Sequence, residues 1–317
     1  DFYNLIDVYL DAVFYPILDP YIFKQEGWHI EAESEQGPFR LKGVVYNEMK
    51  GAYSSPDQLL GEYSIQSLFP DTPYGFDSGG NPKEIPNLTY EQFKAFHSRY
   101  YHPSNAWIFF YGDDNVDTRL ELLREYLDAF ESLKVDSIIR VQTPFKEPRR
   151  LERPYMVAES TREPKSMLTC NWVLGGPEDA VKNFSLRVLE YILLGMPGSP
   201  LRRALIESGL GEDIAGEGLG AELRQIYFST GLKGIDHRNE DQVVQLINQT
   251  LMDLSSKGID SETVEAALNT IEFRLRENNT GSYPRGLILM LRALSTWIYD
   301  QDPHCLLAFE RPLEEIK

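Results

Sequence analysis

Cysteine and positive charge are both scarce in this chain of 317 residues. Its two cysteines, Cys170 and Cys305, are too few for a disulfide framework or a thiolate zinc cluster, which favours a reducing compartment. Lysine and arginine number 31 against 49 aspartates and glutamates, so the net charge is −18. This balance argues against nucleic acid as a partner, since phosphates require a basic face. It is typical of an acidic soluble protein, and it would also favour cationic partners such as basic peptides through long-range attraction.

Long apolar runs are also lacking. No stretch approaches the roughly 20 apolar residues of a transmembrane helix, so we expect no membrane partner. No targeting segment precedes the first apolar positions, which recur at helical spacing from Phe2 to Val13. At the other end, residues 312–317 stop inside a new helical pattern. We therefore expect this chain to be a piece of a longer protein.

The common catalytic motifs are absent as well. No Gly-x-Ser-x-Gly word marks a serine nucleophile, and the five histidines show neither His-x-x-x-His nor His-x-x-Glu-His spacing. Cys170 lies in an apolar run and is expected to be a core residue rather than a nucleophile. His97 and His102 lack a metal-ligating partner nearby in the sequence, so we expect them to be structural. The residues alone therefore contain no complete catalytic constellation.

The hydrophobic pattern predicts an α+β fold, with two-layer domains in which helices pack on one face of a mainly antiparallel sheet. Hydrophobic residues make up 42% of the chain, enough for the cores of two domains. The prolines and arginines of residues 132–155 are typical of a linker, and we place the domain boundary between residues 145 and 146. The predicted strands are 105–111, 166–174 and 225–232. The predicted helices are 2–14, 52–60, 89–100, 120–130, 179–194, 200–208, 240–256, 261–278 and 284–299.

Two further segments have a distinctive composition. Residues 70–87 are dense in Gly, Pro, Asp and Asn, which predicts a long loop that either contacts a substrate or merely connects. Two glycines bracket the stretch 42–51, in which Val44 and Val45 lead to Glu48 and a following helix. Glu48 has two interpretations: a carboxylate at a helix N-terminus favoured by the macrodipole, or an oxygen ligand of a metal ion such as zinc.

Several sequence motifs, taken together and in order, resemble those of one protein family. It is the presequence protease group of the pitrilysin-like (insulinase, M16) zinc metallopeptidases. The words that carry the resemblance are Gly43–Gly51, Tyr74–Gly80, Phe96–Asn105, Phe110–Asp113, Phe273–Gly286 and Trp297–Asp300.

The resemblance implies a zinc ion bound by two histidines of an inverted His-x-x-Glu-His motif and by a distant glutamate, which corresponds to Glu48. The glutamate of that motif would be the general base. The motif is absent here, and we expect it upstream of Asp1. Residues 1–145 would then be the C-terminal part of the first, zinc-ligand-bearing domain, and 146–317 the second, non-catalytic domain. Because catalytic zinc uses three protein ligands, we expect this chain alone to be inactive and zinc-free.

The functional hypothesis concerns the longer parent. It is a zinc metalloendopeptidase of short unfolded peptides, including cationic ones such as cleaved targeting presequences, and its remaining domains are the other expected partner. The alternative is an M16-like scaffold or binding subunit that keeps the fold without the motif. The resemblance implies the mitochondrial matrix or plastid stroma in a eukaryote, and the cytoplasm in a bacterium.

Overall fold

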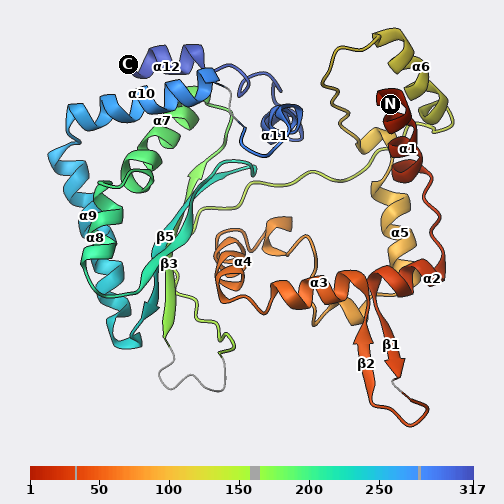
Figure 1. Ribbon diagram of the computed structural model, residues 1–317, viewed down its shortest axis with the longest axis horizontal. Coiled ribbons are helices and arrows are strands. Elements are labelled where there is room, and N and C mark those ends of the chain that lie inside the picture. The colour runs from red at the N-terminus through yellow and green to blue at the C-terminus, as the bar shows by residue number, and fades with distance from the viewer. Residues whose placement is uncertain (33, 158–164, 278–279) are drawn as a thin grey trace. The chain divides into compact units, whose positions relative to one another are not determined.

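The computed structural model describes residues 1–32, 34–157, 165–277 and 280–317, and these residues form two compact units (Figure 1). Unit 1 comprises residues 1–54 and 76–138, and unit 2 comprises residues 55–75 and 139–317. Helices and antiparallel strands occur in both units, which confirms the predicted α+β class. No helix within the described ranges is both long and apolar enough to span a bilayer.

Unit 1 is mostly helical and has one β-hairpin. In the hairpin β1 pairs antiparallel with β2, so that Ile30 lies opposite Leu41. The elements of unit 1 are α1 (Phe2–Phe14), α2 (Pro20–Ile22), a π-turn (Phe23–Gly27), β1 (His29–Ala32), β2 (Phe39–Lys42), α3 (Val44–Ala52), a 3-10 turn (Ile85–Asn87), α5 (Tyr90–Tyr100), a second 3-10 turn (Pro103–Asn105) and α6 (Val116–Leu127).

The core of unit 1 lies where α1 meets α6. Ile6, Leu10 and Phe14 are buried at steps of four along α1, and they pack against residues of α6 such as Leu123 and Leu127. This spacing places the three side chains on one face of the helix. The helix predicted over residues 2–14 is therefore confirmed. The amphipathic helix predicted over residues 120–130 is also present, as α6, but it begins at Val116 and ends at Leu127.

The strand predicted over residues 105–111 is wrong. Residues 103–105 form a 3-10 turn, and no strand within the described parts of the chain pairs with the extended residues that follow. Phe110 instead packs against the α1 cluster. A run of β-forming residues becomes a strand only when a neighbouring strand supplies hydrogen-bond partners, and sequence alone does not reveal that neighbour.

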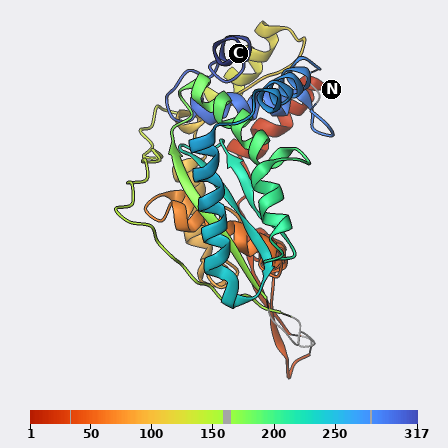
Figure 2. The ribbon, with the colours of Figure 1, turned by 90° about the vertical axis from the view of Figure 1, so that its left-hand side faces the viewer.

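Unit 2 is built around a three-stranded antiparallel sheet in the order β3-β5-β4. Figure 1 shows α8 and α9 beside this sheet, and Figure 2 views the molecule from that side, with α9 in front of the strands. The elements of unit 2 are α4 (Pro56–Leu68), a 3-10 turn (Pro73–Gly75), β3 (Ser166–Gly175), α7 (Ala180–Glu190), a π-turn (Tyr191–Gly195), α8 (Pro200–Glu207), β4 (Asp213–Gly220), β5 (Ile226–Ile235), a 3-10 turn (His237–Asn239), α9 (Glu240–Lys257), α10 (Ser261–Glu277), α11 (Arg285–Trp297) and α12 (Glu310–Ile316).

The two faces of this sheet have different coverings. Alternate strand residues point to opposite faces, so the neighbours Tyr227 and Phe228 belong to different clusters. Tyr227 packs with Leu68 and Phe69 at the end of α4. On the opposite face lies the largest cluster of buried apolar residues, which consists of Leu193, Leu201, Leu205, Phe228, Leu232, Ile235, Val243 and Ile247.

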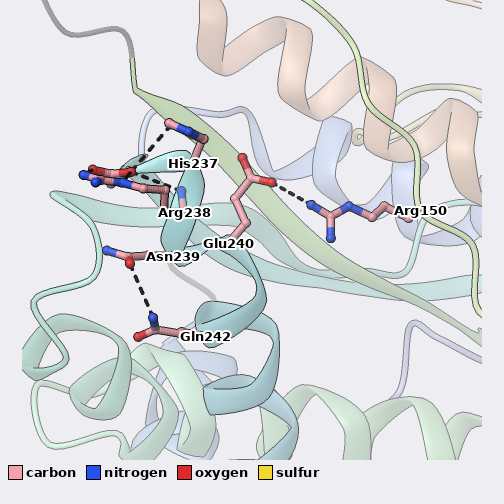
Figure 3. A network of polar contacts seen from close by, with 7 residues as sticks. Arg150, His237, Arg238, Asn239, Glu240 and Gln242 are labelled. Carbon is pink, nitrogen blue, oxygen red and sulfur yellow. Dashed lines mark hydrogen bonds and ion pairs between the residues drawn. The ribbon is translucent and has the colours of Figure 1, made fainter.

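The predicted linker, residues 132–155, contains no helix or strand. Its later part belongs to a strap, defined here as residues 139–157, that is fastened within unit 2. Gln142 is 2% exposed, and its backbone N–H donates to Oε1 of Gln225 at 2.6 Å. Arg150 donates to Glu240 in the first turn of α9 at 2.7 Å (Figure 3), and to the adjacent Asp241 at 2.7 Å. Exposed ion pairs contribute little to stability, so the buried Gln142 is the firmer anchor.

Candidate metal-ligand site

The candidate site is on α3, and a glycine determines where this helix begins. Gly43 precedes the helix with φ +148°, a conformation that is almost restricted to glycine. A Cβ atom at Gly43 would lie 2.2 Å from the carbonyl oxygen of Gly27, so a larger residue cannot fit without moving the backbone. The close approach of the Gly27 backbone therefore requires glycine at the start of α3.

Glu48 lies in the middle of α3 rather than before a helix, which corrects the predicted helix over residues 52–60. The helix starts at Val44, and a second helix, α4, begins at Pro56. The β-branched Val44 and Val45 disfavour a helix only weakly, and burial of Tyr46 outweighs that preference. Since macrodipole effects fade beyond the first turn, the helix-terminus interpretation of Glu48 loses its basis.

The Glu48 carboxylate is exposed, and within the described residues it makes no hydrogen bond or ion pair. Tyr46, two residues earlier and so on nearly the opposite side of the helix, is buried at 9% exposure. Met49 contacts the long loop, because a Cβ atom at Gly79 would lie 2.2 Å from its sulfur. The loop thus supports α3 from the side, while the carboxylate of Glu48 stays accessible.

The histidines of the chain do not complete a metal site with Glu48. Each has a ring nitrogen 2.8 to 3.6 Å from another group, and they are His29, His97, His102, His237 and His304. Within the described residues, no group of three His, Cys, Asp or Glu side chains could hold a metal ion. A catalytic zinc site needs three protein ligands. Glu48 has suitable donor chemistry, but the set of ligands present in this part of the chain does not fit zinc by itself.

Cys170 is a core residue, as predicted. It lies on β3 and packs against the main cluster of unit 2. Burial raises the pKa of its thiol to about 11. Because the thiolate is the reactive form of cysteine, this environment disfavours a nucleophilic role near neutral pH.

Fold and site together define a class: an α+β protein with helices packed on antiparallel sheets, in which an exposed glutamate on a helix, Glu48, is the candidate metal ligand. A family model described as the peptidase M16 inactive domain matches residues 87–271, more than half of the chain. The chain belongs to the peptidase M16 family. This membership confirms the family resemblance predicted from the sequence motifs. Peptidases of this family are metallopeptidases.

The chain is similar over its whole length to two curated relatives. It is 51% identical to presequence protease 1, chloroplastic/mitochondrial, of Arabidopsis thaliana, covering 100% of this chain and 30% of that protein. It is 44% identical to Protein HypA of Clostridium perfringens, covering 100% of this chain and 33% of that protein. The chain therefore spans about a third of the length of these relatives.

A solved structure supports the fold. The M16 inactive domain from Pseudomonas fluorescens aligns with a TM-score of 0.62 at 18% identity, covering 86% of this chain and 64% of that one. At this identity the likeness concerns the fold alone. It agrees with the predicted M16-like α+β architecture.

Proposed function

We propose that this chain is part of a zinc metalloendopeptidase that degrades short unfolded peptides, such as cleaved targeting presequences. The observation that carries the proposal is 51% identity to a presequence protease across the entire chain. Such identity maintained over two compact units is far stronger support than a single motif. The M16 family membership agrees with the same reaction class.

In this proposal Glu48 is the third zinc ligand. Its exposed carboxylate, free of other partners among the described residues, is available to a metal, and its position inside a helix gives it a defined orientation. Bound zinc would polarise the scissile carbonyl and lower the pKa of its water. We place the two histidine ligands and the general base in a segment of the parent before Asp1. This chain contributes the ligand and its rigid support.

The same proposal assigns a role to each of the two domains. Residues 1–145 would be the C-terminal part of the zinc-ligand-bearing domain, and 146–317 the second, non-catalytic domain. The irregular residues 132–155 and the restart of regular structure at β3 support this division. The net charge of −18 suits cationic peptide substrates, whose association would weaken as salt rises. The compartment would be the mitochondrial matrix or plastid stroma in a eukaryote, and the cytoplasm in a bacterium.

The test is Glu48→Gln in the full-length parent, because glutamine keeps the size of the side chain and removes the charge. We expect zinc content to fall well below one per chain and cleavage of a cationic presequence peptide to fall about 100-fold or more. Glu121→Gln is the matched control, since Glu121 is an exposed glutamate on another helix of unit 1.

Two results would contradict the proposal in different ways. Unchanged zinc content and cleavage in Glu48→Gln would refute the ligand role. A wild-type parent that contains no zinc and cleaves no peptide would favour the M16-like scaffold instead.

A further inference from the structure

A short apolar segment of unit 1, defined here as residues 106–111, has unpaired backbone groups. Its sequence is Ala-Trp-Ile-Phe-Phe-Tyr, without charge, proline or glycine. It opens in the extended conformation, with φ −118° and ψ 138° at Ala106. The N–H groups of residues 107–111 donate to no backbone carbonyl in the described parts of the chain. Consecutive backbone donors therefore lack the hydrogen bonds that a neighbouring strand would supply.

The two faces of the apolar segment have different surroundings. Phe110 packs in the cluster around the buried residues of α1, and Cζ of Arg119 on α6 lies 4.7 Å from the centre of its ring. Trp107 and Tyr111 are 36% and 50% exposed. Their odd positions place them on the face opposite to Phe110 if the segment is extended throughout. Helices thus cover one face of the segment, as they cover a sheet in a two-layer fold.

The composition of the apolar segment is unlike that of a free edge. Natural edge strands usually carry charges, prolines or bulges, which prevent them from pairing with another chain. The apolar segment has no charge and no proline, and aromatic residues occupy four of its six positions. Short uncharged runs of high β propensity are the ones that pair readily with a further strand. The segment is therefore suited to accept a strand.

We propose that the apolar segment accepts a β-strand from the part of the parent chain that precedes Asp1. The inference rests on the proposed function only because it assumes such a parent. This chain covers 30% and 33% of the two curated relatives, so most of the length of each relative lies outside the matched region. A chain of that length has ample residues for a further strand, since an ordinary strand needs only about five or six.

The start of α1 lies beside the apolar segment, which favours a strand that precedes Asp1. The N–H of Asn115, four residues after the segment, donates to the hydroxyl of Tyr3 at 2.8 Å. Tyr3 also belongs to the same cluster as Phe110. A preceding strand is therefore tethered near the segment, and the tether raises its effective concentration. Backbone hydrogen bonds would hold the strand, and side chains opposite Trp107 and Tyr111 would select it.

The test is hydrogen exchange, measured by mass spectrometry on this chain and on the full-length parent. In this chain the amides of residues 107–111 should exchange without protection. In the parent the same amides should exchange at least about 100-fold more slowly. Strand β5 is the internal control, because it is paired on both sides within this chain and should be protected in both proteins.

A cross-link identifies the partner strand. A photoreactive benzophenone side chain is placed at position 111 of the parent, where the natural residue Tyr111 is aromatic and exposed. The cross-linked peptides, sequenced by mass spectrometry, should come from residues that precede Asp1. A cross-link only to residues that follow Lys317 would overturn the assignment of the partner.

Proline variants of the parent test the backbone itself. Ile108→Pro and Phe109→Pro each remove one N–H, and neighbouring residues of a strand direct their N–H groups to opposite edges. At least one of the two variants should reduce the protection of the segment at least tenfold. Ile108→Ala and Phe109→Ala are the matched controls, which shorten the side chain and keep the donor. If the proline variants fail to fold, the exchange comparison and the cross-link still decide.

Three outcomes separate this inference from its alternatives. Equally fast exchange of the apolar segment in this chain and in the parent would overturn it. Protection that appears in this chain alone and rises with concentration would also overturn it, and would assign the edge to a second copy. The Glu48→Gln parent should keep the slow exchange even where zinc is lost, so a failure of the proposed function is read separately from a failure of strand pairing.

Discussion

The start of α3 offers the sharpest test of how the candidate ligand is held. Replacing Gly43 by alanine introduces two separate penalties. The backbone conformation at φ +148° is strained for any residue with a Cβ atom, which costs about 1–3 kcal/mol. The new Cβ atom would also lie 2.2 Å from the Gly27 carbonyl oxygen and 2.8 Å from the Cα atom of Trp28. Relieving such a backbone collision costs about 1–3 kcal/mol more.

The chain offers a matched control for the first penalty. Gly112 has φ +153°, and a Cβ atom there would meet nothing within 4 Å. Gly112→Ala therefore includes the conformational penalty without the collision. We expect Gly43→Ala to lower the free energy of unfolding by about 2–6 kcal/mol, and by about 1–3 kcal/mol more than Gly112→Ala does. Losses of that size are a large fraction of the stability of an ordinary domain.

Hydrogen exchange measured by mass spectrometry separates these effects by segment. In Gly43→Ala, amides in residues 44–54 should lose protection, including Asn47, whose N–H donates to the Gly43 carbonyl at 3.0 Å. Amides of β5 in unit 2 should keep their protection. If the two glycine variants lose the same stability, within about 0.5 kcal/mol, the steric argument is wrong. In the full-length parent, the displaced helix should also reduce zinc affinity.

Two further predictions concern the core of unit 2. Leu205→Ala should lower the free energy of unfolding by about 2–5 kcal/mol, because Leu205 is fully buried. Leu189→Ala should lower it by less than about 1 kcal/mol, because Leu189 is 38% exposed. Urea denaturation of both variants measures this difference. Cys170, whose pKa is raised to about 11, should react with iodoacetamide at pH 8 about 100-fold more slowly than the same thiol in urea. The thiol should become reactive as the pH rises toward 11, and equal rates at pH 8 would contradict its burial.

Helices with strong local signals were predictable from the sequence. The Thr89 and Gln92 capping box is present, with reciprocal bonds of 3.2 and 2.8 Å. Helix α10 follows its apolar positions at steps of three or four; its predicted end, Asn278, lies outside the described residues. These features depend on residues a few positions apart, so a short window of sequence contains the information needed.

Elements that depend on distant partners were not predictable. Strand β4 was missed because its glycines, at 216, 218 and 220, give no strand signal. It is a strand because β5 supplies its hydrogen bonds, with Gly218 opposite Ser229. The same dependence explains the incorrect strand at 105–111, where the β-forming residues have no paired neighbour within the described chain.

The candidate site shows the same limit. No spacing rule selected Glu48, which came from a family resemblance, and the position of its carboxylate became known only with helix α3.

The division into compact units has a consequence for how this protein can be cut. The chain passes from one unit to the other at three places, near residues 54, 75 and 138. Unit 2 is therefore discontinuous, since α4 comes from a segment inserted within unit 1. A fragment of residues 146–317 would lack Phe69, which is 0% exposed, as well as Gln142 of the strap. Truncation at the linker would therefore remove the α4 residues that cover one face of the sheet. A circularly permuted chain that keeps α4 attached would be the better way to obtain unit 2 in isolation.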